Sequence, residues 1–527
     1  MTSVRGFAGW KRLSVVGRPM ARSAALVCVG LLTAAWSAPA KAQLTAEALT
    51  GGAVDNVDKF GADVDDAISA FQKGEIERSR KLLKMARETQ PKLAPVEVML
   101  AQLYILAQRA DLARVELERS LRESPADPEA YLVLAEAALQ EGRNREATMM
   151  YSQAAPVLEK FNDNAKRKKA FVPRLYSGDA QAAEGREDWK TAKDDLVKLL
   201  AVLEAEKADK GDSALKVEDT DLATHHVRLA RALFKDGNAR ESYEELRKAA
   251  GLAPKVVAPE VALAQFYKQA KDKETQSKAE TWIGNAQKVS KDNFATLSAL
   301  ARWYFDANKI KEAATYCDQA LAVEPTNVDV LLLKAVVARI QKEKNALSLL
   351  ERVHMEAPLN PVAINQISLA LADSVKDSEK LDAKKKEEND NTARRAIQFA
   401  ELNARLNPKS ADAYATLGWA AYRAGRMTDA QRALGQAIQG QLNPDSLYFV
   451  ATILKELDRN AEALKIVNAA LDSEAPFAYH DEAHALQNRL VRRGRSSDRS
   501  ESRESESAGS GASGASAPVR PTSSPTK

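Results

Sequence analysis

Two histidines lie four residues apart in the segment His480-Asp481-Glu482-Ala483-His484. On a helix this spacing places both imidazole rings on one face, where they could bind a zinc ion. A zinc site needs further ligands, and the sequence identifies no third one. A second pair, His225-His226, consists of adjacent residues whose side chains point in different directions on a helix. We therefore interpret neither pair as a metal site, and the first pair as surface residues.

The other candidates for chemistry fail on their context. Residues 480–484 resemble the His-Glu-x-x-His motif of metalloproteases, but Asp481 stands where that motif has its catalytic Glu. The segment from Gly509 to Gly514 has the glycine spacing of a dinucleotide-binding loop, yet it follows no strand and opens no helix. Cys317 is interpreted as a small buried residue, since no His partner can be placed beside it. The sequence thus predicts no enzyme, no cofactor and no metal site.

A periodic pattern of small residues organises most of the chain. In Ala411–Pro444, Gly425 separates two short helical patterns, and Gly418 and Ala430 are small enough to let the two helix backbones approach closely. The small position of the second helix recurs along the chain, and six of its ten steps lie within one residue of 34. It is filled by Ser79, Ala113, Ala147, Ala192, Ser242, Ala279, Ala313, Ala346, Ala396, Ala430 and Ala463.

This pattern resembles the tetratricopeptide repeat, a helix–turn–helix unit of 34 residues, in its exported bacterial form. The resemblance implies an all-α fold, a right-handed superhelical solenoid of about eleven repeats over residues 59–472. Insertions near 159–172, 204–221 and 374–391 are expected to be charged spacers or extended helices. Residues 473–491 are expected to form a capping helix, with an apolar side made of Phe477, Ala485, Leu486 and Leu490.

The same resemblance implies a concave groove lined by the first helices. The residue after each first-helix small position, and those three and four residues further on, should face that groove. These positions are apolar in the early repeats, Met99 among them, basic in the middle and aromatic late. The alternative is that they are ordinary surface and packing residues. We predict a partner-binding surface at Arg231, Lys268, Arg302, Trp419, Tyr422, Arg423 and Tyr448.

The first 42 residues have the features of a cleavable export signal. A basic leader precedes an apolar run from Ala24 to Trp36, and Ala40-Lys41-Ala42 is a small-x-small cleavage site. The run is short for a membrane span, and Met20 could be the true start. Removing the six positive charges of this segment changes the formal net charge from +4 to −2, so we expect no broad affinity for nucleic acid. We expect a flexible lead-in at 43–58 and a disordered tail at 492–527.

These features predict a non-enzymatic periplasmic or secreted scaffold that binds protein or peptide partners in its groove. We expect no stable membrane span once the signal is removed. The sequence leaves open an accessory role in envelope polysaccharide synthesis or export, in which a glycan would meet the aromatic positions. That alternative depends on analogy with other envelope systems.

We predict that the mature protein begins near Gln43 and is located outside the cytoplasm, because the leader, the apolar run and the cleavage site stand in the order of a signal peptide. Intact-mass analysis of the protein recovered from the envelope or medium measures this directly. A mass that retains residues 1–42 would contradict the prediction.

Overall fold

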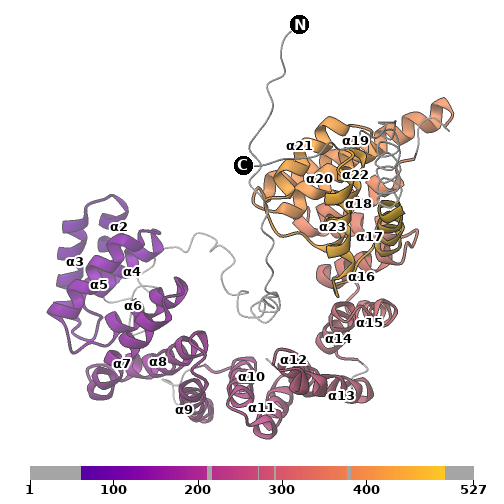
Figure 1. Ribbon diagram of the computed structural model, residues 1–527. Helices are drawn as coiled ribbons and strands as arrows, with labels where there is room; N and C mark the ends of the chain where they lie inside the picture. The colour runs from indigo at the N-terminus through magenta and orange to yellow at the C-terminus, as the bar shows by residue number, and fades with distance from the viewer. Residues whose placement is uncertain (1–60, 210–215, 271, 290–291, 377–380, 493–527) are drawn as a thin grey trace, which may run out of the picture. The chain divides into compact units, whose positions relative to one another are not determined.

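The chain is all-α. The computed structural model describes residues 61–209, 216–270, 272–289, 292–376 and 381–492, and every regular element within them is a helix (Figure 1), which confirms the predicted fold class. The predicted signal and lead-in lie outside these residues, as does the predicted C-terminal tail except for Arg492, which is the last residue of a helix. The helices are α2 (Gly61–Gln72), α3 (Ile76–Thr89), α4 (Val96–Leu106), α5 (Ala110–Glu123), α6 (Glu129–Gln140), α7 (Asn144–Lys160), α8 (Ala165–Gly185), α9 (Trp189–Ala208), α10 (Asp219–Lys235), α11 (Ala239–Leu252), α12 (Pro259–Lys268), α13 (Lys273–Val289), α14 (Phe294–Asp306), α15 (Ile310–Val323), α16 (Val328–Ile340), α17 (Ala346–Glu356), α18 (Pro361–Ser374), α19 (Ala383–Leu406), α20 (Ala411–Arg423), α21 (Met427–Ala437), α22 (Pro444–Glu456) and α23 (Asn460–Leu471), followed by a helix at 480–492.

The labelled helices of the described residues group in chain order into eleven successive pairs, from α2/α3 to α22/α23, as the repeat pattern predicts. Each predicted small residue lies on the second helix of its pair and is at most 6% exposed. The first helix passes close to this position at Ala430, since a Cβ added to Gly418 of α20 would be in van der Waals contact with the carbonyl oxygen of Ala430 at 3.4 Å. Where Ser79 fills the position, its hydroxyl donates to the carbonyl of Ala67 across the pair at 2.7 Å. The two helices of a pair therefore pack closely at these small residues.

Most of the turns inside the pairs contain one residue in the left-handed region of backbone space. Four of these residues are the predicted glycines, with φ between 72° and 91°: Gly74, Gly142, Gly237 and Gly425. Five other turns use a residue with a side chain at φ between 56° and 59°: Gln108, Glu187, Asn308, Lys342 and Asp458. The left-handed residue lets the turn supply hydrogen-bond donors to the carbonyl groups at the end of the first helix. In one such turn Arg426 donates its N–H to the carbonyl of Ala421 at 2.8 Å.

The three insertions contribute length to helices in the described residues. Residues 159–172 cover the end of α7 and the first turns of α8, which begin at the capping side chain of Asn164. The described parts of 204–221 belong to the end of α9 and the start of α10. Residues 374–391 lead into α19, which has 24 residues and is longer than any other labelled helix among the described residues.

One charge in the first insertion is not a solvated spacer residue. Arg167 is 8% exposed and forms ion pairs with Asp127 at 2.8 Å and Glu129 at 2.7 Å. Its guanidinium also lies against the rings of Phe161 and Phe171, at 5.3 Å and 5.1 Å from their centroids. The basic run at 166–169 thus helps to fix α8 against α6.

The chain divides into two compact units, unit 1 with residues 1–254 and 262–282, and unit 2 with residues 255–261 and 283–527. In unit 2 the helix at 480–492 packs on the core through Ala483, Leu486 and Leu490. These residues make an apolar stripe at helical spacing. Ala485, expected on that stripe, is exposed, because Ala483 takes the buried position instead. Among the described helices, none has the length and apolar character needed to cross a membrane.

We expect Ala430→Asp to lower the free energy of unfolding by about 3 kcal/mol or more, because an unpaired carboxylate would be buried at the backbone contact with Gly418. Urea denaturation followed by circular dichroism measures the change. The neighbouring exposed residue supplies the control, and Gln431→Asp should stay within about 0.5 kcal/mol of the wild type. Equal losses in the two variants would contradict the close contact.

Candidate binding surfaces on the first helices

Neighbouring first helices contact one another in both units, and we call the face that the first helices of a unit form its inner face. In unit 1, α6 contacts α8, and in unit 2, α18 contacts α20, which contacts α22. In α6 the positional rule of the sequence selects Glu136, Leu139 and Gln140, which follow the buried Ala135 by one, four and five residues. All three line a cavity on the inner face of unit 1.

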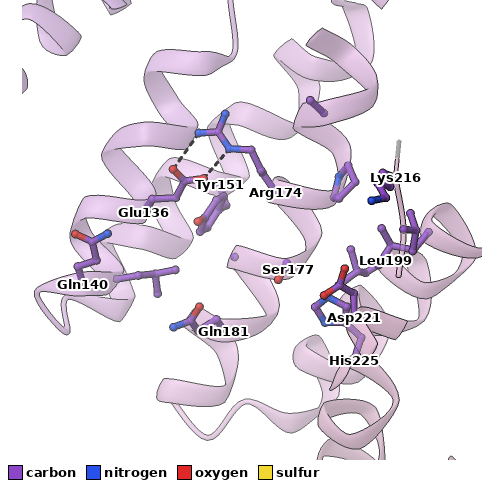
Figure 2. A pocket seen from close by; sticks show the side chains of 16 residues that line it. Glu136, Gln140, Tyr151, Arg174, Ser177, Gln181, Leu199, Lys216, Asp221 and His225 are labelled. Atoms are coloured by element: carbon purple, nitrogen blue, oxygen red, sulfur yellow. Dashed lines mark hydrogen bonds and ion pairs between the residues drawn. The ribbon is translucent and has the colours of Figure 1, made fainter. Parts of the chain in front are cut away.

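This unit 1 cavity has a volume of about 600 Å³. It is bordered by three successive first helices, α6, α8 and α10, and by side chains of α7 and α9. Figure 2 shows side chains of α6 on one side and side chains of α9 and α10 on the other, with Ser177 and Gln181 of α8 between them. The cavity is therefore large enough for a few residues of a bound chain.

Tyr151 of α7 forms the floor of the cavity. Its side chain is fully buried, and its hydroxyl has no hydrogen-bond partner among the described residues. The hydroxyl fits beside α8 only because residue 178 is glycine, since a Cβ there would lie 2.0 Å from the hydroxyl oxygen. Burial raises the pKa of Tyr151, so the group remains a protonated donor. A buried hydroxyl without a partner costs about 1–3 kcal/mol, which makes it a candidate for recognition.

Of the titratable side chains at the cavity, Arg174 and Glu136 pair with each other, and His225 is uncharged at neutral pH. Arg174 donates two parallel hydrogen bonds to Glu136, at 2.8 Å from Nε and 2.9 Å from Nη2 (Figure 2). His225 lines the opposite side, and its Nδ1 has no partner among the described residues. Burial, followed by the nearby charges of Arg228 and His226, lowers the pKa of His225 to about 4. At neutral pH its imidazole is therefore uncharged.

The inner face of unit 2 is filled by its own side chains. Tyr479, which precedes the last helix, is 7% exposed and donates from its hydroxyl to Asp373 of α18 at 2.6 Å. Arg339 of α16 lies 5.5 Å from the centre of the Tyr479 ring and forms an ion pair with Asp445 of α22 at 2.6 Å. Trp419 of α20 donates its indole N–H to Asp373 at 3.2 Å. We call these five residues the unit 2 cluster.

The predicted late groove residues meet at this cluster. Trp419 is 4% exposed and stacks on Phe449, with ring centroids 4.7 Å apart. Tyr422 and Tyr448 are half-buried beside it at 5.5 Å and 5.7 Å, and Arg423 lies over its ring at 5.5 Å. The structure thus brings all four predicted residues together, but Trp419 contacts its own chain and not solvent. Their role in partner binding stays a prediction.

The predicted basic residues each have local partners or lie at a helix end. In unit 1, Arg231 is half-buried with its guanidinium 5.9 Å from the centre of the Trp189 ring, and Lys268 is exposed at the end of α12. In unit 2, Arg302 is exposed and forms an ion pair with Asp306 at 3.3 Å. Their role in a partner-binding surface stays a prediction.

Sequence reasoning missed part of the unit 2 cluster, although a signal for it was present. Arg339 follows the fully buried Ala335 by four residues, and Asp373 follows the fully buried Ser368 by five. These are the spacings that the positional rule uses. The sequence does not settle the register of the first helix around 333–335, which hides Arg339. Ser368 departs from the Ala or Gly of most other first-helix small positions, which hides Asp373. One groove prediction was wrong, because Met99 was expected in the groove and is fully buried in the core.

The residues considered for chemistry occupy ordinary positions. Cys317 is fully buried, and burial raises the pKa of its thiol to about 12. The rings of His480 and His484 lie 4.6 Å apart, centre to centre, on the exposed side of their helix. His226 is buried against Glu245, with 2.6 Å between Nδ1 and the carboxylate. Within the described residues, no group of three or more potential ligands is placed to hold a metal ion.

No protein-family model and no curated protein sequence matches this chain. Similar solved structures include a thermophilic TPR protein of Thermus thermophilus, with 18% identity over 38% of this chain and 98% of that chain and a TM-score of 0.31. Yeast Tom70 has 14% identity over 84% and 97% of the two chains, with a TM-score of 0.28. A tetratricopeptide repeat protein from Parabacteroides merdae has 10% identity over 51% and 98%, with a TM-score of 0.37. The repeat fold itself is evident from the eleven helix pairs of the described residues and their small contact positions.

We predict that His225 makes the protein less stable in acid. The free side chain takes up a proton near pH 6.5 and the folded one only near pH 4, so the unfolded state binds more protons between these values. This contribution to the free energy of unfolding is complete above pH 6.5 and is lost as the pH falls toward 4. Between pH 7 and pH 4, the wild type should lose about 2 kcal/mol more than His225→Gln.

Urea midpoints of the two proteins at pH 7.5, 6, 5 and 4 test this difference. Asp179, whose pKa burial raises to about 6, acts in the opposite direction, because the folded state then binds the extra proton. That effect is common to both proteins and cancels in the comparison. Parallel pH profiles would contradict the role assigned to His225.

Proposed function

We propose that this chain of tetratricopeptide-type repeats is an exported, non-enzymatic scaffold that binds an extended protein or peptide segment on the inner face of unit 1. The observation that carries the proposal is the open cavity bordered by α6, α8 and α10. Repeat proteins use such surfaces, built from equivalent positions of successive units, to bind extended partners. The inner face of unit 2, by contrast, is occupied by Tyr479.

The non-enzymatic part of the proposal is supported by the chemistry of the cavity. Arg174 and Glu136 are bonded to each other, and Nδ1 of His225 has no hydrogen-bond partner among the described residues that would orient it as a general base. Ser177 accepts a hydrogen bond from Arg228 at 3.1 Å, so it is held by a cation and not activated by a base. The cavity therefore offers groups for binding, without an assembled nucleophile and base. Export is supported by the signal-like first 42 residues.

A protein partner is favoured over a glycan for a structural reason. The glycan alternative depends on aromatic rings that can face a sugar, and the candidates were Trp419, Tyr422 and Tyr448. Trp419 is stacked on Phe449, and Tyr448 is stacked on Tyr479 with ring centroids 5.2 Å apart. These rings are engaged within the unit 2 cluster and its surroundings, which reduces the area that they can present to a sugar.

Site-specific photo-crosslinking in the native envelope tests this proposal. A benzoylphenylalanine residue placed at Gln181, an exposed residue at the cavity, should give a discrete protein adduct that mass spectrometry can identify. Placed at Val115, which is 52% exposed on the second helix α5, it should give none. The same probe at Tyr422 tests the late groove.

An adduct from Gln181 alone supports the proposal. Adducts only from Tyr422 would move the binding surface to unit 2 and contradict the assignment to unit 1. Equal adducts from Gln181 and Val115, or none from any position, would contradict a specific binding surface on the inner face of unit 1.

A further inference from the structure

The charges around the unit 1 cavity do not select a charged ligand. Glu136 and Arg174 satisfy each other through two hydrogen bonds, and His225 is neutral at pH 7. The two other charged residues of the lining, Lys216 and Asp221, have opposite signs. An acidic or a basic segment would therefore meet as much repulsion as attraction here.

The groups that a ligand can reach are neutral hydrogen-bonding side chains. Gln140 of α6 and Gln181 of α8 are exposed residues of the lining, and each amide offers both donors and an acceptor. Below them the hydroxyl of Tyr151 and Nδ1 of His225 are buried without a partner in the described residues. A peptide backbone presents the complementary set, one N–H donor and one carbonyl acceptor per residue.

The apolar part of the lining is aliphatic. Leu139, Leu199 and Leu203 contribute side chains from α6 and α9, and Pro173 contributes its ring from α8. Apart from the half-buried imidazole of His225, Tyr151 is the one aromatic residue of the lining within the described part of the chain, and its side chain is fully buried. Stacking of a nucleobase or a sugar needs an accessible aromatic face, which this surface does not offer. An aliphatic side chain, in contrast, can be buried against Leu139 and Leu203.

We infer that the cavity takes an uncharged, extended peptide segment with an aliphatic side chain. The aliphatic side chain lies on Leu139 and Leu203, and the amides of Gln140 and Gln181 bond the peptide backbone. The hydroxyl of Tyr151 is buried beneath these groups, and it donates to a backbone carbonyl when the side chains at the cavity floor shift to admit the ligand. This inference rests on the proposed function, because it specifies the segment that the inner face of unit 1 binds.

Peptide binding by the full mature chain tests the inference. The probes are four sets of fluorescent peptides of about ten residues: neutral with one Leu or Val, neutral with Gly, Ser and Asn only, acidic, and basic. Neutral xylan, dextran and chitin oligosaccharides form a fifth set. The neutral aliphatic set should bind best, and the loss of its aliphatic residue should weaken binding about tenfold.

Tyr151→Phe separates recognition from structure, because it removes only the hydroxyl. The free protein should become no less stable, and slightly more stable if anything, since the lost group has no partner in the described residues. Affinity for the neutral aliphatic set should fall about fivefold. The double change of Gln140 and Gln181 to Ala should weaken binding further, and Gln153→Ala, at an exposed residue of α7 outside the lining, should leave it unchanged.

The outcomes are distinguishable. Best binding by the acidic or the basic peptides, or full affinity in both Tyr151→Phe and the double variant, overturns this inference while the proposed peptide-binding function stands. Binding of oligosaccharides with no peptide bound overturns both. Preference for the neutral aliphatic set, weakened by the cavity variants and not by Gln153→Ala, supports both.

Discussion

The close contact inside each helix pair is the constraint on which the rest of the structure depends. A Cβ at Gly418 would already be in van der Waals contact with the second helix, 3.4 Å from the carbonyl oxygen of Ala430, so a side chain longer than a methyl group there would press against its neighbours. Ser79 is tolerated in the second helix because its hydroxyl bonds the carbonyl of Ala67 across the contact. By fixing which side of the first helix is packed, this contact also fixes which of its residues face inward. Which residues form the inner face is therefore determined by the packing inside each helix pair.

The same positions are used differently in the two units. In unit 2 they supply Arg339, Asp373 and Trp419, which are joined by Tyr479 into one network of ion pairs, hydrogen bonds and ring contacts. Burying a charge is costly unless it is paired, and here Arg339 is balanced by Asp445. In unit 1 the equivalent positions of α6 are Glu136, Leu139 and Gln140, and a cavity remains between them and the next first helices.

The sequence predicted the repeats well because their signal is local. A small residue every 34 positions is visible without knowing which helices meet, and so is a turn that contains Gly425. Turns such as the one at Gln108, with φ of 57°, have no such signal, because tertiary packing imposes the left-handed conformation on an ordinary residue. The sequence could not predict the unit 2 cluster for another reason. Arg339 meets Asp445 and Tyr479 across 106 and 140 residues, and periodicity alone does not tell how far along the chain the curvature brings helices together.

The unit 2 cluster and the unit 1 cavity differ in whether their buried polar groups have hydrogen-bond partners. In the unit 2 cluster the hydroxyl of Tyr479, the indole of Trp419 and the guanidinium of Arg339 all have partners within the unit. A network satisfied in this way stabilises one arrangement and gains nothing from an additional molecule. In the unit 1 cavity the hydroxyl of Tyr151 and Nδ1 of His225 are buried without a partner in the described residues. Since an unmade buried hydrogen bond costs stability, a molecule that reaches these two groups would recover the loss, and together with the open cavity this is why we propose binding at unit 1.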